Sequence, residues 1–299
     1  MLRRFSVRSG LLAALALLLT SVSSGQGAAP PTRTPLVRSP GNADWAPSVG
    51  AAFTRAEQEK KFVFVELDNP ECGNCRRMDA LLYPAFEFEA ILIPMVPAKV
   101  ELDSPDGQSL ARRYDLSDVP SILVTTSEGR LVFRMQGFLS APDFYAHIEK
   151  DLAAYRAFAK KIDAQDVANL PATEAVETGR DLLRRRDPGA ALPRLERAAA
   201  ASDAAPPVRD EALELAAAAQ LDLGRIADSR RTIEKLIRTT KDPDRRERAE
   251  LFQAQIPLSE NKPEEALQLF QQFRQAHPQS SYSAKVDEMI QRLEGKKAP

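Results

Sequence analysis

The segment "FVFVELDNPECGNCRRM", residues 62–78, constrains this chain more than any other feature. Its first seven residues are apolar, β-branched or aromatic with two acidic exceptions, and they predict a buried strand. Helical spacing begins almost directly after this strand, at the two cysteines of the chain, Cys72 and Cys75. The segment therefore predicts a strand, a short loop and a helix that carries both thiols.

The elements around this segment predict a compact α/β domain of about a hundred residues. In order, helical or strand patterns cover residues 48–61, 62–68, 75–83, 95–103, 107–116, 121–126, 130–137 and 140–162. The order is helix, strand, helix, strand, helix, strand, strand, helix. Pro97 suggests that the second strand starts irregularly. We expect this domain at residues 45–155, followed by a helical extension or linker at 156–172.

Strand patterns are absent from Thr173 onward, and six helical stretches pair into three hairpins. Ala191, Ala227 and Ala266 each lie early in the second helix of a pair, at spacings near the 34 residues of tetratricopeptide repeats. The last hairpin resembles such a repeat most closely, down to Pro278. We predict an all-α array at residues 173–296 that ends in a capping helix; a helical bundle with accidental spacing is the alternative.

The first residues have the pattern of a secretory signal peptide. Three arginines come first, then an apolar run, then small residues: Arg3, Arg4 and Arg8, "LLAALALLL", "TSVSSGQGAAP". The run is shorter than the roughly twenty residues that span a bilayer, so the mature chain is expected to lack a transmembrane span. We predict a signal peptide at 1–27, a Pro- and Ser-rich linker at 28–44, and a periplasmic or secreted location. An uncleaved anchor and a mitochondrial leader are the alternatives.

Composition excludes one class of function. The chain has 299 residues, 43% hydrophobic and 28% charged, which is usual for globular domains. Its formal net charge is −1, and long basic runs are lacking. We therefore expect no nucleic-acid partner.

The two cysteines are spaced for reversible disulfide exchange. Residues three apart on a helix share a face, with Cβ atoms about 5–6 Å apart, which is within reach of a disulfide. A bridge over so short a loop adds little stability, so a structural role explains the pair poorly. Cys72 falls at the helix N-terminus, where free N–H groups and the helix dipole favour its thiolate. Cys72 is thus the expected attacking thiol and Cys75 the resolving one.

Cys-x-x-Cys is also half of many zinc sites, which need two further ligands. Among cysteine and histidine side chains only His147 and His277 remain, one in each predicted domain. Carboxylates show no spacing that suggests a complete site. We therefore expect redox chemistry, with no metal and no cofactor other than the redox-active disulfide Cys72–Cys75.

The segment "FVFVELDNPECGNCRRM" resembles the active-site region of thioredoxin-fold proteins, especially the disulfide isomerases. The resemblance continues through "AKVELD", "LARRYDLSDVPSILV" and "GRLVFRMQGFLSAPDFYAHI", and covers about residues 45–152. It implies that Pro120 is the family's cis-proline, with Val119 before it, in a loop that offers backbone groups to an extended substrate. An ordinary trans-proline turn is the alternative. Gly73 and Asn74, between the cysteines, complete the expected substrate contacts.

The resemblance also implies a role for a buried carboxylate. Glu66, six residues before the first cysteine, matches the acid that moves protons to and from the resolving thiol. Its place in an apolar run favours burial and a shifted pKa over a solvent-facing position. Lys99 matches a nearby lysine, either a partner of Glu66 or an exposed strand residue. Gly137 matches a glycine that lets the last strand bend near the site.

Two departures from the family concern the charge near Cys72. Glu71 stands where the family usually has an aromatic residue, and its negative charge disfavours the Cys72 thiolate and acidic partners. The dipeptide Gly-Asn lacks the imidazole that isomerases place there. Both departures predict a reducing or isomerising redox poise.

Two functions of different class fit these features. The first is an exported thiol–disulfide oxidoreductase with protein clients, a redox-recycling partner, and a protein partner on the helical repeats. The second is a scaffold or assembly factor whose thioredoxin-like head binds clients without turnover. A peroxidase of related fold lacks its Thr/Ser-x-x-Cys motif. The intact cysteine pair favours the oxidoreductase.

Overall fold

The computed structural model describes residues 43–295, which form two compact units divided between Lys161 and Ile162. The predicted signal peptide, 1–27, lies outside the described residues, as does the predicted linker up to residue 42. Within the described part of the chain, no helix combines the length and the apolar character that crossing a bilayer requires.

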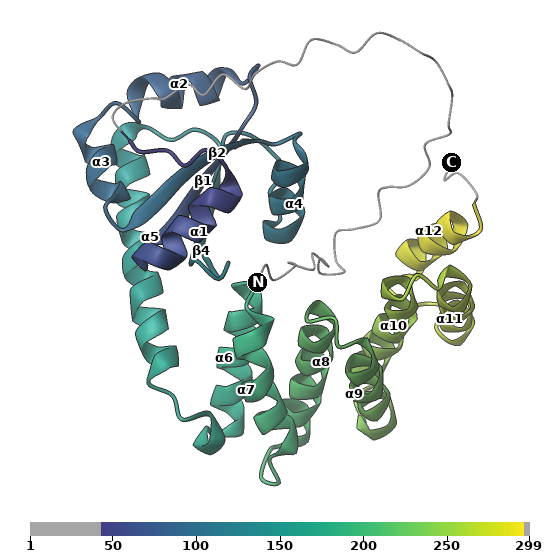
Figure 1. Cartoon of the computed structure of the whole chain (residues 1–299). Helices are drawn as coiled ribbons and strands as arrows, with labels where there is room; N and C mark the ends of the chain where they lie inside the picture. Colours follow the sequence, from purple (N-terminus) through teal and green to yellow (C-terminus); the bar gives the residue numbers. More distant parts are fainter. Residues whose placement is uncertain (1–42, 296–299) are drawn as a thin grey trace. The chain divides into compact units, whose positions relative to one another are not determined.

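The first unit is an α/β domain (Figure 1). Its elements are α1 (Val49–Glu59), β1 (Phe62–Asp68), α2 (Gly73–Leu81), α3 (Phe86–Leu92), β2 (Met95–Glu101), α4 (Pro105–Tyr114), β3 (Ser121–Thr125), β4 (Leu131–Gln136) and α5 (Ala141–Asp163). Helix α3 was not expected from the sequence. It is only seven residues long, and its apolar and acidic residues alternate, which hides the four-residue spacing of the buried Phe88 and Leu92.

The four strands form one mixed sheet in the order β2-β1-β3-β4. β1 pairs parallel with β2 and antiparallel with β3, which pairs antiparallel with β4. Pro97 lies in the edge strand β2, where its missing N–H breaks no central ladder. Its carbonyl accepts a hydrogen bond of 2.8 Å from the Ala46 N–H. The strand therefore runs through the proline without an irregular start.

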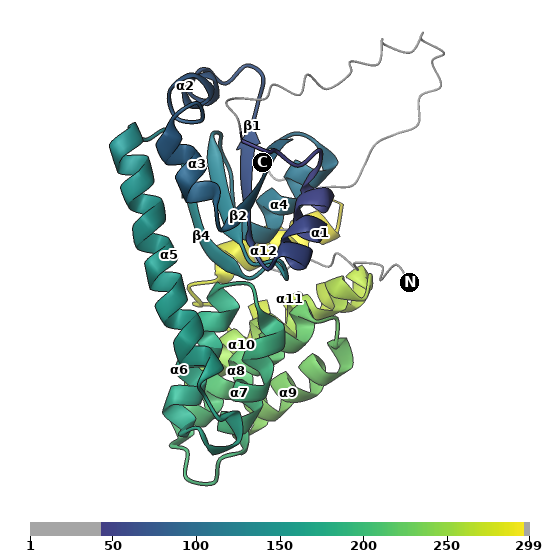
Figure 2. The ribbon, with the colours of Figure 1, turned by 60° about the vertical axis from the view of Figure 1, so that its left-hand side comes forward.

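Helices cover both faces of the sheet, α3 and α5 on one side and α1 and α4 on the other (Figure 2). Because successive side chains of a strand point to opposite faces of the sheet, β1 contributes side chains to two cores. Phe64 faces a core that contains Met78 of α2, while Val63 and Val65 face the core beneath α1 and α4. Glu66 has the parity of Phe64 and so lies on the face that α2 covers.

The long helix α5 continues beyond the expected domain end at residue 155. Tyr155 belongs to the first core and stacks edge-on against Phe62 of β1, with ring centroids 5.6 Å apart. Phe158 and Ala159, which follow the expected boundary, pack against the same core, so the helix remains on the sheet beyond residue 155. A short 3₁₀ turn at Val167–Asn169 follows the helix.

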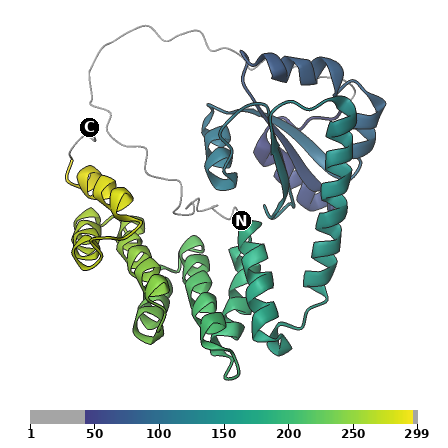
Figure 3. The ribbon, with the colours of Figure 1, turned by 180° about the vertical axis from the view of Figure 1, so that it is seen from behind.

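The second unit is all-helical. Its helices are α6 (Ala172–Arg184), α7 (Pro188–Ala200), α8 (Pro206–Asp222), α9 (Ile226–Thr239), α10 (Pro243–Ser259), α11 (Pro263–Ala276) and α12 (Ser283–Leu293). Each packs against the next in the chain, as Figures 1 and 3 show, in an arrangement compatible with a repeat array. Four of them have proline in the first turn, where its missing N–H has no intrahelical partner to lose.

Small buried residues recur at the fourth position of the second helix of each hairpin. Ala191 and Ala266 occupy this position in α7 and α11, and both are fully buried. In α9 the position is held by Ser229, which is fully buried and donates a 2.7 Å hydrogen bond to the Ala217 carbonyl. Ala227 also lies early in α9, as expected, but its side chain is exposed, so Ser229 is the residue equivalent to Ala191 and Ala266.

Ion pairs connect the first helices of neighbouring hairpins. Arg180 of α6 pairs with Glu211 of α8, and Glu214 of α8 pairs with Arg245 of α10 at 2.8 Å. Both pairs join residues 31 positions apart. The recurrence along the array places α6, α8 and α10 in one layer.

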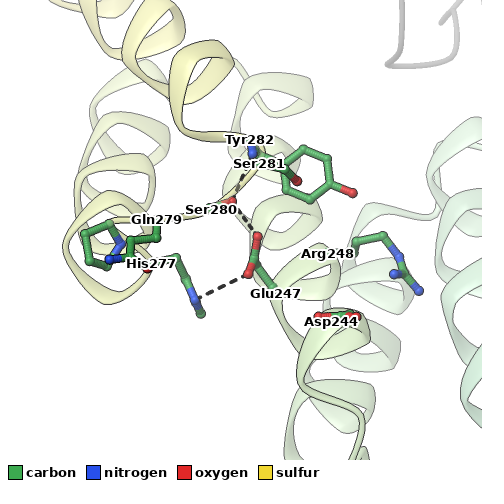
Figure 4. Close-up of a pocket in the computed structure, with 9 residues that line it drawn as sticks. Asp244, Glu247, Arg248, His277, Gln279, Ser280, Ser281 and Tyr282 are labelled. Atoms are coloured by element: carbon green, nitrogen blue, oxygen red, sulfur yellow. Dashed lines mark hydrogen bonds and ion pairs between the residues drawn. The ribbon is translucent and has the colours of Figure 1, made fainter.

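Figure 4 shows a polar pocket of about 620 Å³ between α10 and the turn that joins α11 to α12. Glu247 of α10 accepts a hydrogen bond from Ser280 and lies 3.8 Å from the Nδ1 atom of His277. The Nε2 atom of His277 lies 2.6 Å from a carboxylate oxygen of Glu250. These contacts hold the turn before α12 against α10.

Candidate active site

The two cysteines lie at the start of α2, as the sequence predicts. Cys72 is the N-cap residue, and its Sγ accepts a 3.0 Å hydrogen bond from the Cys75 N–H. The two residues form a disulfide with Cα atoms 5.2 Å apart. Cys72 is half-buried, whereas Cys75 is 3% exposed. A partner can therefore reach Cys72 more easily than Cys75.

The Val119–Pro120 peptide bond is cis, as predicted. Ser121, the next residue, pairs with Leu67 across β3 and β1, so Pro120 lies at the carboxyl end of β1. The cysteine loop leaves the sheet at this same end. The Pro120 carbonyl accepts a 2.8 Å hydrogen bond from Gly137, whose φ of 88° is in the region that favours glycine.

Glu66 and Lys99 are paired residues on the neighbouring strands β1 and β2. Glu66 is fully buried, and its Oε2 lies 2.8 Å from the Lys99 Nζ. Burial raises the pKa of Glu66 from 4.5 to about 7, although Lys99 and the Tyr83 hydroxyl act in the opposite direction. The carboxyl group can therefore gain and lose a proton near neutral pH, which is what proton transfer to a thiolate requires.

Lys99 also binds Asp79 of α2, so one ammonium group serves two carboxylates. It lies over the rings of Trp45 and Tyr83, at 5.3 and 4.8 Å from their centroids. Burial lowers the pKa of Lys99, but Glu66 and Asp79 outweigh it and the net shift is upward. The lysine thus remains charged and links β1 to the cysteine helix.

Sequence reasoning missed Asp79 and also Asp68. Asp79 follows Cys75 by four residues, so helical spacing could have placed both on the face that meets the sheet. Burial raises the pKa of Asp68, and the nearby carboxylates of Asp79 and Glu101 raise it further, against the pull of Lys99. The ionisable groups near the cysteine helix therefore include Asp68 and Asp79 in addition to Glu66 and Lys99.

The residues expected to contact substrate beside the cysteines lie at the surface. Gly73 and Asn74 are both exposed. Glu71 is exposed as well, and its N–H donates a 2.9 Å hydrogen bond to the side-chain oxygen of Asn69. The loop before Cys72 is thus shaped by an Asx turn that leaves the Glu71 carboxylate in solvent.

The histidines considered as zinc ligands have other neighbours. His147 lies 3.1 Å from Asp151 on the same helix, and His277 lies against Glu250 of the helical array. Across residues 43–295, no three His, Cys, Asp or Glu side chains gather in a way that would hold a metal ion.

The family model described as "Thioredoxin-like domain" matches residues 49–151. Residues 49–151 are a thioredoxin-like domain. The boundaries of this match enclose the whole sheet, the cysteine pair and the cis-proline. The all-helical unit, residues 162–295, follows the thioredoxin-like domain in the chain.

Comparison with known proteins finds sequences and structures that are similar to part of this chain. A protein disulfide-isomerase of Ricinus communis is 27% identical over 103 residues, 33% of this chain. The match spans only 20% of that relative's length. A thioredoxin from Thermus thermophilus is 23% identical, with a TM-score of 0.33, over 36% of this chain and 85% of its own. A DsbH oxidoreductase is 16% identical, with a TM-score of 0.34, over 44% and 95% of the two chains.

Proposed function

We propose that this protein is an exported thiol–disulfide oxidoreductase that reduces or isomerises disulfides in protein clients. The observation that carries the proposal is the half-buried Cys72 at the start of α2, bonded to the buried Cys75. Helix N-termini stabilise thiolates, and the thiolate is the reactive form. The proposal of export rests on the first 27 residues, which have the basic, apolar and small-residue pattern typical of a signal peptide.

The exchange proceeds in two steps. The Cys72 thiolate attacks a client disulfide, a mixed disulfide forms, and one client sulfur leaves as a thiolate. Cys75 then loses its proton and attacks the Cys72 sulfur, which re-forms the Cys72–Cys75 bond and releases the second client thiolate. Two electrons pass to the client, and its two released thiolates take up protons from the solvent, to which Cys75 gives up one proton. A thiol reductant of the same compartment then returns the pair to its dithiol form.

Glu66 is the proposed base for the second step. It lies on the sheet face that α2 covers, and its pKa of about 7 makes it able to accept the Cys75 proton near neutral pH. Lys99 is the proposed partner that keeps the carboxylate stable once it is charged. The cis-proline loop, Val119–Pro120, is proposed to hold an extended client segment beside the cysteines, together with Gly73 and Asn74.

The helical unit is proposed to bind a protein partner as a tetratricopeptide-like array. Its neighbouring hairpins repeat both the buried small residue and the ion pairs, and stacked hairpins usually form binding surfaces. The polar pocket beside Glu247 and His277 is one recess on this surface.

The test is reduction of insulin disulfides by the full chain with dithiothreitol as the reductant. Activity that disappears in Cys72→Ser supports the oxidoreductase, and Cys75→Ser should accumulate mixed disulfides that identify clients and the recycling partner. A wild-type chain with no activity and no trapped partner would contradict it. Client binding that survives the double change Cys72→Ser/Cys75→Ser would favour the scaffold instead.

A further inference from the structure

Arg76 places a guanidinium group beside the turn that contains Cys72. It follows Cys72 by four residues, and its Nη1 donates a 2.9 Å hydrogen bond back to the Pro70 carbonyl. Its Nη2 would lie 3.8 Å from a Cβ atom built on Gly73. The guanidinium is therefore near backbone groups on both sides of Cys72 in the chain.

A positive charge here has a specific electrostatic effect. The helix N-terminus favours the Cys72 thiolate, but the Glu71 carboxylate next to it acts in the opposite direction. The dipeptide Gly73-Asn74 supplies no imidazole that would offset Glu71. The guanidinium of Arg76 carries a positive charge, and its hydrogen bond to the Pro70 carbonyl holds that charge at this turn.

We propose that Arg76 is a positioning residue for the exchange reaction: its charge, held at the Cys72 turn by the Pro70 carbonyl, offsets Glu71 and keeps Cys72 in the thiolate form near neutral pH. This inference rests on the proposed function and adds the residue that sets the reactivity of the attacking sulfur. It also modifies the predicted redox poise, because stabilising the thiolate makes the disulfide more oxidising.

Arg77 provides the matched control within the same helix. Its guanidinium lies over the Phe138 ring, 4.2 Å from the centroid, and donates a 3.4 Å hydrogen bond to the Asn74 side chain. The charge and the side chain are the same as those of Arg76, but Arg77 is not bonded to the loop before Cys72. If only the net charge of the helix mattered, removing either arginine would change the thiolate fraction of Cys72 equally. If the position of the charge matters, removing Arg76 has the larger effect.

The experiment uses the full chain with Cys75→Ser, in which Cys72 is the only thiol, and iodoacetamide as the probe. The rate of alkylation is measured from pH 5 to 10 for Arg76→Gln, Arg76→Lys, Arg77→Gln and Glu71→Gln. Arg76→Gln should lower the thiolate fraction at pH 7 about three- to tenfold, as expected for loss of one nearby unit charge. Arg76→Lys should restore part of it, and Arg77→Gln should change it less than twofold.

Glu71→Gln should move the alkylation midpoint in the opposite direction, and Glu71→Gln/Arg76→Gln should return it close to the starting value. Equal effects of Arg76→Gln and Arg77→Gln, or none from Arg76→Gln, would overturn the inference. Circular dichroism checks the fold, and Arg76→Glu, which should shift the midpoint further upward, gives a second variant. Because alkylation requires no client, the two failures can be told apart: a shifted midpoint without insulin reduction would refute the proposed function but would still show that Arg76 stabilises the Cys72 thiolate.

Discussion

The Lys99 ammonium group lies 2.8 Å from the fully buried carboxylate of Glu66 and simultaneously binds Asp79 on the cysteine helix. β1 and β2 bring the first two residues together as cross-strand partners, and α2 supplies the third. A buried acid is thus connected through one cation to a partly exposed acid. The pKa of Glu66, about 7, follows chiefly from burial, which Lys99 only partly offsets.

Glu66→Gln should stabilise the protein at pH 8. The native state holds the Glu66 proton up to about pH 7, while the unfolded chain loses it near 4.5. The stability that the native-state proton on Glu66 contributes is therefore fully present below pH 4.5. It is lost as the pH rises from 4.5 to 7, which lowers the free energy of unfolding by about 3 kcal/mol. Urea unfolding should show that Glu66→Gln raises the free energy of unfolding by about 1–3 kcal/mol at pH 8, since Lys99 still has Asp79 as a partner. At pH 4 the variant and the wild type should differ little. A destabilised Glu66→Gln at pH 8 would contradict this.

The same change should slow the release of the client. Glutamine cannot accept the Cys75 proton, so resolution of the mixed disulfide should slow at least about tenfold at pH 7. Stopped-flow measurement of the Cys75-dependent step gives the rate. The difference from wild type should shrink as the pH rises, because hydroxide can then remove the Cys75 proton in place of Glu66. Equal rates at pH 7 would remove Glu66 from the mechanism.

Lys99→Met should lower the free energy of unfolding more by itself than in combination with Glu66→Gln. Without its cation the buried carboxylate loses its stabilising charge, so the pKa of Glu66 should rise above 7 and unfolding at pH 8 should become easier by about 3 kcal/mol. The double variant has no buried charge to leave unpaired. A double-mutant cycle by urea unfolding should therefore give a coupling of at least about 1 kcal/mol. Additive effects would show that the ion pair is energetically unimportant.

Gly179→Ala should destabilise the first helical hairpin. A Cβ atom at this position would lie 2.6 Å from a methyl group of Leu195, which must move, at a cost of about 1–3 kcal/mol. Gly189→Ala is the control, because the nearest atom to its added Cβ lies 3.6 Å away and alanine favours the helix. Thermal unfolding should separate the two variants by several degrees, and identical midpoints would argue against close packing of α6 on α7.

Local signals were sufficient for much of this protein. The apolar run before Cys72 and the helical spacing after it predicted the strand and the N-cap cysteine, because each depends on a few consecutive residues. The cis Val119–Pro120 bond was expected only from the resemblance to thioredoxin-fold proteins. The buried Glu66 was also predictable, since an acid in an apolar strand has few other places to go. The sequence left Lys99 as either a partner of Glu66 or an exposed strand residue. The register between β1 and β2 places the two residues side by side, so they pair.

Other features required the tertiary structure. Asp79 and Lys99 are 20 positions apart in the chain and meet only through the tertiary fold, and Arg76 meets Pro70 only because the loop turns back through Asn69. In the array, the choice of Ser229 over Ala227 depended on how α9 is rotated against α8. Sequence patterns determined which segments form strands and helices and where the thiols lie. Packing between elements decided which charges meet, because side-chain contacts between distant segments leave no periodic pattern in the chain.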